Sequence, residues 1–126
     1  MTPFGRRLRA LRAQHGLTLK AMATEIGVSP AYLSALEHGH RGRPNRRFVQ
    51  QVCRVLGVQR DEADKLARLA DLSHPRVTVD TAGLTPEATE LANRLAEQIH
   101  TMSQDRIDRM LAELRREAPE DVTASA

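Results

Sequence analysis

Arginines are the side chains with the clearest chemical use in this chain, and they gather in its first half. Residues 1–58 hold ten Lys and Arg against two Asp and Glu, a net charge of +8. Residues 59–126 hold nine basic and fourteen acidic residues, a net charge of −5. Guanidinium groups bind phosphate oxygens well, so this distribution predicts a polyanionic partner for the first half alone.

Two of these arginines, Arg41 and Arg43, lie in a segment with the composition of a loop, residues 38–45, HGHRGRPN. Its two glycines and its proline favour irregular backbone. We expect this loop, with Arg46 directly after it, to supply most of the contacts to phosphate. Its two histidines have no cysteine or third spaced ligand nearby, so they do not predict a metal site.

Other chemistry is poorly represented in the sequence. We find no nucleophile with a base at useful spacing, no glycine-rich phosphate loop and no paired ligand motif. We therefore expect neither an enzyme nor a cofactor. Cys53 is the single cysteine, which excludes an intrachain disulfide, and its apolar-periodic surroundings favour a small buried hydrophobe over a redox switch.

The arginine-rich loop follows a stretch, residues 17–39, whose pattern predicts two short helices joined by a tight turn. Gly27 can take the positive φ that often ends a helix. Ser29 followed by Pro30 is a favourable helix start, because serine caps well and proline fits the first helical position. Only one edge of the second helix is apolar, which leaves its other side free.

The pattern M-A-x-x-I-G-V-S-x-x-x-L-S-x-L-E-x-G, from Met22 to Gly39, resembles the helix-turn-helix of Cro and phage-repressor proteins, the XRE family. The resemblance covers residues 4–72, a little over half of the chain. It implies an all-α fold, with a five-helix, lambda-repressor-like DNA-binding domain whose third helix reads the major groove. The alternative is a helical hairpin with no role in nucleic-acid binding.

The resemblance also places the DNA contacts. The family's base-touching positions fall here on Pro30, Ala31, Ala35 and Ser34, none of which is a long hydrogen-bonding side chain. Short side chains can still pack against thymine methyl groups. The residues expected at the DNA are Arg6, Arg9, Thr18, Ser29, Pro30, Ala31, Tyr32, Ser34, Ala35, His38, His40, Arg41, Arg43, Asn45 and Arg46.

Several of these assignments have alternatives. Arg6 and Arg9 are equally compatible with a solvated basic face, and Tyr32 with a half-buried surface aromatic. Leu19 stands where the family commonly has a glutamine that touches the DNA backbone, so the amino terminus of this helix is left to meet a phosphate. Arg43 lies where the family can reach towards the minor groove, whose width such a residue would read.

The resemblance further implies an ion pair between the first helix and the reading helix. In the family an arginine of helix one pairs with the glutamate near the end of the reading helix, and here these are Arg12 and Glu37. Removing one partner of such a partly buried pair is costly. We therefore expect Glu37 to be structural and not catalytic.

Five helices are expected in a first domain of residues 1–72. Thr2 starts the first, which runs to about residue 15, and Thr18, Ser29 and Asn45 precede the next three. The fifth covers residues 59–72. Aromatic residues are only 2% of the chain, so we expect an aliphatic core. Residues 73–84 read as an extended linker, in which a short strand at 77–79 is also compatible with the sequence.

Residues 85–118 are expected to form a C-terminal helical segment, either a hairpin or one bent helix. It is too short to bury its apolar stripe alone. We favour dimerisation over packing on the first domain, because a palindromic operator needs two reading helices. The residues expected at the dimer contact are Leu91, Leu95, Ile99, Met102, Ile107, Met110, Leu111 and Leu114. Residues 119–126 are expected to be a disordered tail.

These features predict a sequence-specific, DNA-binding transcriptional regulator, favoured as a dimeric repressor of a palindromic operator. One alternative is an antitoxin that holds a toxin with its C-terminal helices and autoregulates its operon. Another is a domain that keeps the fold without binding DNA. No apolar run approaches the length of a membrane span and no secretory leader is recognised, so we expect a cytoplasmic, nucleoid-associated protein.

Overall fold

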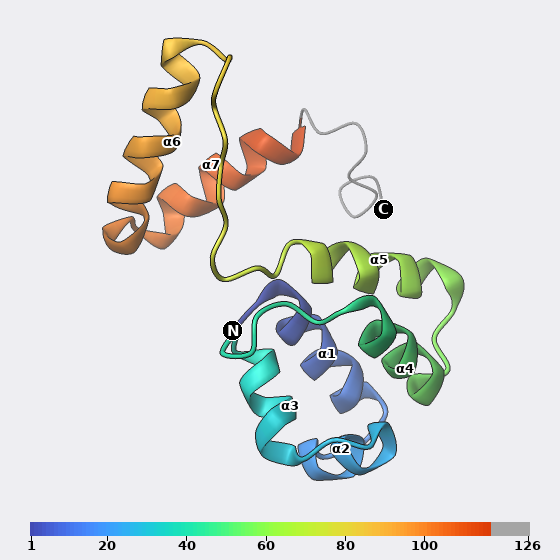
Figure 1. Cartoon of the computed structure of the whole chain (residues 1–126). Coiled ribbons are helices and arrows are strands. Elements are labelled where there is room, and N and C mark those ends of the chain that lie inside the picture. The colour runs from blue at the N-terminus through green and yellow to red at the C-terminus, as the bar shows by residue number, and fades with distance from the viewer. Residues whose placement is uncertain (117–126) are drawn as a thin grey trace. The chain divides into compact units, whose positions relative to one another are not determined.

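The computed structural model describes residues 1–116, in which every regular element is a helix (Figure 1). This confirms the expected all-α fold. The first five helices are α1 (Pro3–Gln14), α2 (Leu19–Ile26), α3 (Pro30–Glu37), α4 (Arg46–Leu56) and α5 (Arg60–Asp71). They are followed by α6 (Pro86–Gln98), the 3-10 turn η1 (Ile99–Thr101) and α7 (Gln104–Arg116). The tail expected at 119–126 lies outside the described residues.

The starts of the first four helices follow from side-chain caps that the sequence predicts. These caps are Thr2 for α1, Thr18 for α2, Ser29 for α3 and Asn45 for α4. Each side-chain oxygen accepts a hydrogen bond from the backbone N–H three residues further on, at 2.8–3.0 Å. An oxygen in this place satisfies an N–H group that has no partner within its own helix.

The turn between α2 and α3 depends on Gly27. Its φ is +89°, a left-handed conformation that side chains disfavour. Its N–H donates to the carbonyl of Ala23, which closes the end of α2. The chain is thereby turned within three residues, so that α3 begins immediately after Ser29.

The core of the first unit is aliphatic apart from two phenylalanines. The rings of Phe4 and Phe48 meet edge to face, with centroids 6.3 Å apart, and join α1 to α4. Val55 of α4 is half-buried and packs against this core. The buried apolar residues are Phe4, Leu8, Leu11, Met22, Ala23, Ile26, Leu33, Leu36, Phe48, Val49, Val52, Leu56, Leu66 and Ala70.

The first compact unit runs to Arg76, beyond the boundary expected at residue 72. Ser73 explains the difference, because it is buried although it is polar. Its Oγ accepts from the N–H of Phe4 at 3.0 Å and donates to the carbonyl of Leu69 at 2.6 Å. Ser73 thus ties the end of α5 to the start of α1. Residues 77–79 form no strand.

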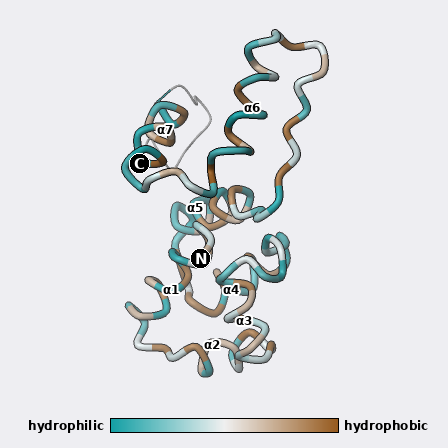
Figure 2. Tube along the Cα trace, turned by 90° about the vertical axis from the view of Figure 1, so that its left-hand side faces the viewer, coloured by the Kyte–Doolittle hydropathy of each residue, from teal (hydrophilic) through white to brown (hydrophobic). Residues whose placement is uncertain are grey.

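The second unit begins at Val77, and its helices α6 and α7 are separate. Met102 has extended backbone, with φ −72° and ψ 137°, which breaks the helix between them. Thr85 caps α6, and the Oγ of Ser103 accepts from the N–H of Arg106 in α7. No side chain of either helix is fully buried, and hydrophobic and hydrophilic residues alternate along both (Figure 2).

Candidate nucleic-acid interface

Helix α3 presents a face of small side chains that the core does not use. Its apolar edge, Leu33 and Leu36, is buried. On its other side Pro30 and Ala31 are exposed, and Ala35 is half-buried. Ser34, also half-buried, is on the same helix. An exposed helix face without bulky groups can approach the floor of a major groove closely.

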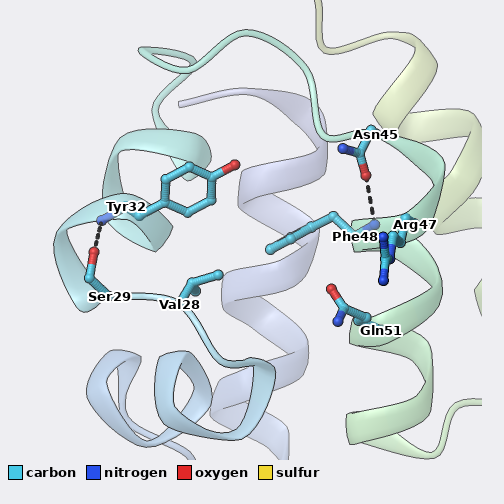
Figure 3. A pocket seen from close by; sticks show the side chains of 7 residues that line it. All are labelled: Val28, Ser29, Tyr32, Asn45, Arg47, Phe48 and Gln51. Carbon is cyan, nitrogen blue, oxygen red and sulfur yellow. Dashed lines mark hydrogen bonds between the residues drawn. The ribbon is translucent and has the colours of Figure 1, made fainter.

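An open hollow of about 410 Å³ lies between the turn before α3 and helix α4 (Figure 3). Tyr32 extends from α3 into this space, and Arg47 and Gln51 face it from α4. Asn45 also lines it while capping α4. The hollow therefore combines polar side chains with the amino terminus of α4, whose unpaired N–H groups favour an anion.

Arg47 and Gln51 were not among the residues predicted from the sequence, which favoured Arg46. Residues i and i+4 share one face of a helix, so Arg47 and Gln51 necessarily lie together. Arg46, one residue earlier, lies on another face and lines a different hollow, between α4 and α5. Because neighbouring residues of a helix lie on different faces, the sequence predicts that only one of Arg46 and Arg47 faces α3. It does not indicate which one.

Arg43 also lines the hollow between α4 and α5, where it meets the carboxylate of Asp71. Its Nη1 lies 2.9 Å from Oδ1 of Asp71, and both side chains are exposed. The sequence predicted that Arg43 extends towards a minor groove and did not predict its ion pair with Asp71. Cys53 is half-buried beside the same hollow, and burial raises the pKa of its thiol, which keeps it protonated at neutral pH.

Arg41 differs from Arg43, because it lies against α3. Its Cζ is 5.5 Å from the centroid of the Tyr32 ring, a cation–π contact. The rings of His38 and His40, which precede Arg41 in the chain, are stacked, with centroids 6.4 Å apart. Nδ1 of His38 lies 2.8 Å from the carbonyl oxygen of Ser34. Within residues 1–116 no three His, Cys, Asp or Glu are grouped as metal ligands.

The arginines of α1 have different surroundings. Arg6 and Arg9 are exposed, as is the cap residue Thr18 of α2. Arg7, between them, instead binds Glu62 of α5, with Nε 3.0 Å from Oε2. The hydrogen bond from Arg7 lowers the pKa of Glu62. Glu62 therefore belongs to an ion pair between α1 and α5.

The ion pair between α1 and α3 is present and largely buried. Nη2 of Arg12 lies 3.1 Å from both carboxylate oxygens of Glu37, whose side chain is only 3% exposed. The Nε of Arg12 is buried without a hydrogen-bond partner, so Glu37 provides the main compensation for burying this guanidinium. The pair holds the end of α3 against α1.

The residues expected at a dimer contact lie along the second unit. Leu91, Ile99, Leu111 and Leu114 are exposed, and Leu114 most of all, at 68%. The remaining four are half-buried: Leu95, Met102, Ile107 and Met110.

No helix among the first 116 residues is long and apolar enough to cross a membrane.

The chain is similar in sequence to HTH-type transcriptional regulators. The HTH-type transcriptional repressor RghR of Bacillus subtilis (strain 168) is 40% identical over 58 residues, 46% of this chain and 43% of RghR. The regulator SinR of the same organism is 33% identical over 54 residues, 43% of this chain and 49% of SinR. This chain therefore spans less than half the length of either relative.

A similar solved structure is that of the clp gene regulator ClgR from C. glutamicum. It has 35% sequence identity and a TM-score of 0.46, and the match covers 55% of this chain and 84% of that one. The family described as helix-turn-helix domain matches residues 3–66, which include α1 to α4 and most of α5. This chain therefore belongs to the helix-turn-helix domain family and is a member of its XRE type.

Proposed function

We propose that this chain is a sequence-specific, DNA-binding transcriptional repressor that acts as a homodimer on a palindromic operator. The observation that carries the proposal is the placement of α3. Its outward face of small side chains is left free by the core, and Arg41 and Arg47 lie beside it. The name of RghR, a repressor that is 40% identical over 58 residues, supports the regulatory part.

Recognition of the bases is assigned to α3. Ala31 and Ala35 are small enough to let the helix lie deep in the major groove, where they would meet thymine methyl groups. The hollow between α3 and α4 would take a backbone phosphate, held by Arg47, Tyr32 and the amino terminus of α4. Phosphate contacts of this kind position a protein on DNA, while the bases that α3 meets select the sequence.

Dimerisation is assigned to the second unit. Neither α6 nor α7 buries a side chain fully, so both keep apolar surface that a second copy could cover. A two-fold dimer would present two copies of α3 to successive major grooves, and a palindromic site matches that symmetry. Repression would then be steric, because a bound dimer denies RNA polymerase access to the promoter.

Selection of binding sites from a pool of random duplexes tests the proposal. The full chain should enrich a palindromic motif whose half-site centres lie about 34 Å apart, one turn of B-DNA. Light scattering on the same sample should give twice the mass of the chain. Failure to enrich any motif would contradict sequence-specific binding. A monomer in solution that gains mass only with another protein would replace the homodimer by a partner complex.

A further inference from the structure

The ion pair of Arg43 and Asp71 joins the arginine-rich loop to the end of α5. Nη1 of Arg43 is 2.9 Å from Oδ1 of Asp71, and the two side chains are 44% and 60% exposed. Exposed pairs of this kind are weak, because water and salt screen both charges. A phosphate group can therefore displace this carboxylate at little cost.

The fold has no evident need for the charge of Asp71. It is the last residue of α5, where the helix dipole disfavours an anion. The end of α5 is instead anchored by Ser73, which hydrogen-bonds to Phe4 and Leu69. Asp71 thus lies at an unfavourable position for its own helix, and its polar contact is with a residue of the proposed DNA-binding loop.

The other arginine of this loop shows a different arrangement. Arg41 lies over the ring of Tyr32 on α3, already beside the reading helix. Arg43 is held instead towards α5, where it lines the hollow between α4 and α5. Arg41 therefore lies near the proposed DNA surface, whereas Arg43 is paired with a carboxylate of the same chain, that of Asp71.

We infer that Asp71 lowers the affinity for DNA by binding Arg43 while no DNA is present. Its carboxylate takes the place of a phosphate, and DNA binding exchanges the one anion for the other. The free energy of the ion pair is then subtracted from the binding energy that Arg43 contributes. This inference rests on the proposed DNA-binding function and names a residue that tunes it.

The test compares the affinity of the full chain and its variants for a fluorescent duplex of mixed sequence over a range of salt concentrations. Asp71→Asn should bind about twofold to fivefold more tightly than wild type at low salt. The gain should shrink as salt rises, because screening already weakens the ion pair in wild type. Arg43→Gln should bind more weakly and reduce the salt slope by about 0.9.

The matched control is Asp64→Asn, which removes one exposed carboxylate from the same helix. It measures the general effect of one less negative charge. The gain from Asp71→Asn should exceed that of Asp64→Asn, and in the Arg43→Gln background the two should become equal. The thermal midpoint of Asp71→Asn should stay at or slightly above that of wild type, since the helix end loses an unfavourable charge.

Three results would overturn the inference. Equal gains from Asp71→Asn and Asp64→Asn in the wild-type background would show that Asp71 does not restrain Arg43. Weaker binding by Asp71→Asn would show that Asp71 positions Arg43 for DNA. Absence of salt-dependent binding by wild type would reject the proposed function itself, and this inference with it, whereas the first two results leave DNA binding intact.

Discussion

Gly5 of α1 lies directly against the backbone of Glu37 in α3. A Cβ atom at Gly5 would be 2.1 Å from the carbonyl oxygen of Glu37, closer than two such atoms can approach. The same carbonyl accepts a hydrogen bond from the N–H of Thr2 at 3.0 Å. The absence of a side chain at Gly5 therefore allows α1 to pack closely against the end of α3.

Gly5→Ala should destabilise the first unit by about 1–3 kcal/mol, because the new methyl group meets backbone that cannot move aside locally. In an unconstrained helix the same exchange would stabilise by about 0.5–1 kcal/mol. Urea unfolding followed by circular dichroism measures the difference. Ala10→Gly, at an exposed position of α1, is the control and should cost only the ordinary helix propensity. A more stable Gly5→Ala variant would contradict the close approach.

Glu37→Ala should cost about 3–5 kcal/mol, because it leaves the guanidinium of Arg12 buried without its anion. Thermal unfolding should show a much lower midpoint than wild type. The double variant Arg12→Met, Glu37→Leu removes both charges and should recover much of the loss. A melting curve of Glu37→Ala that coincides with wild type would show that the pair has no structural role.

The pair of Arg7 and Glu62 should make stability depend on pH. The pKa of Glu62 is lowered from its ordinary value of 4.5, so the carboxylate stabilises the fold fully above that value. This contribution is lost as pH falls through the lower, folded-state pKa. Wild type should exceed Glu62→Gln by about 0.2–1 kcal/mol near neutral pH, with convergence in acid.

Thermal unfolding of wild type and Glu62→Gln at several pH values measures this pH dependence. A constant difference between wild type and Glu62→Gln, from neutral pH to below the folded-state pKa, would contradict the assignment. The prediction concerns the pair alone, because Arg7 remains charged throughout this range.

The sequence allows the helices to be predicted because their signals are local. Thr2, Thr18, Ser29 and Asn45 each cap a helix through an N–H only three residues away, so residue type and spacing suffice. The ion pair of Arg12 and Glu37 was predicted from the resemblance to a family, and it is present in the structure.

Contacts between separate helices carry no such local signal. Arg43 and Asp71 are 28 residues apart, and Arg7 and Glu62 are 55 apart, so only the packing of α5 brings them together. The burial of Ser73 depends on the start of α1 in the same way. The sequence therefore shows which arginines lie near α3 in the chain. Their carboxylate partners in α5, Glu62 and Asp71, depend on the tertiary fold.

Leu91→Glu and Leu114→Glu should each weaken or abolish the proposed dimer. Both leucines are exposed, so a charge there leaves the fold intact but cannot be buried against a second copy. Light scattering should show a shift from dimer to monomer, and affinity for a palindromic site should fall towards that for a half-site. Ala96→Glu, also exposed on α6, is the control for added charge. Unchanged mass for both leucine variants would place the dimer contact elsewhere.

The central claim is that the outward face of α3 lies in a DNA groove, and Ala31→Glu tests it most directly. A glutamate in the first turn of a helix favours the fold, so lost binding would not reflect unfolding. The control Ala10→Glu adds the same charge to an exposed site of α1. Affinity for duplex DNA should fall more than tenfold in Ala31→Glu, about 1.4 kcal/mol, and far less in Ala10→Glu. Equal affinities of the two variants, or wild-type binding that does not change with salt, would contradict the account.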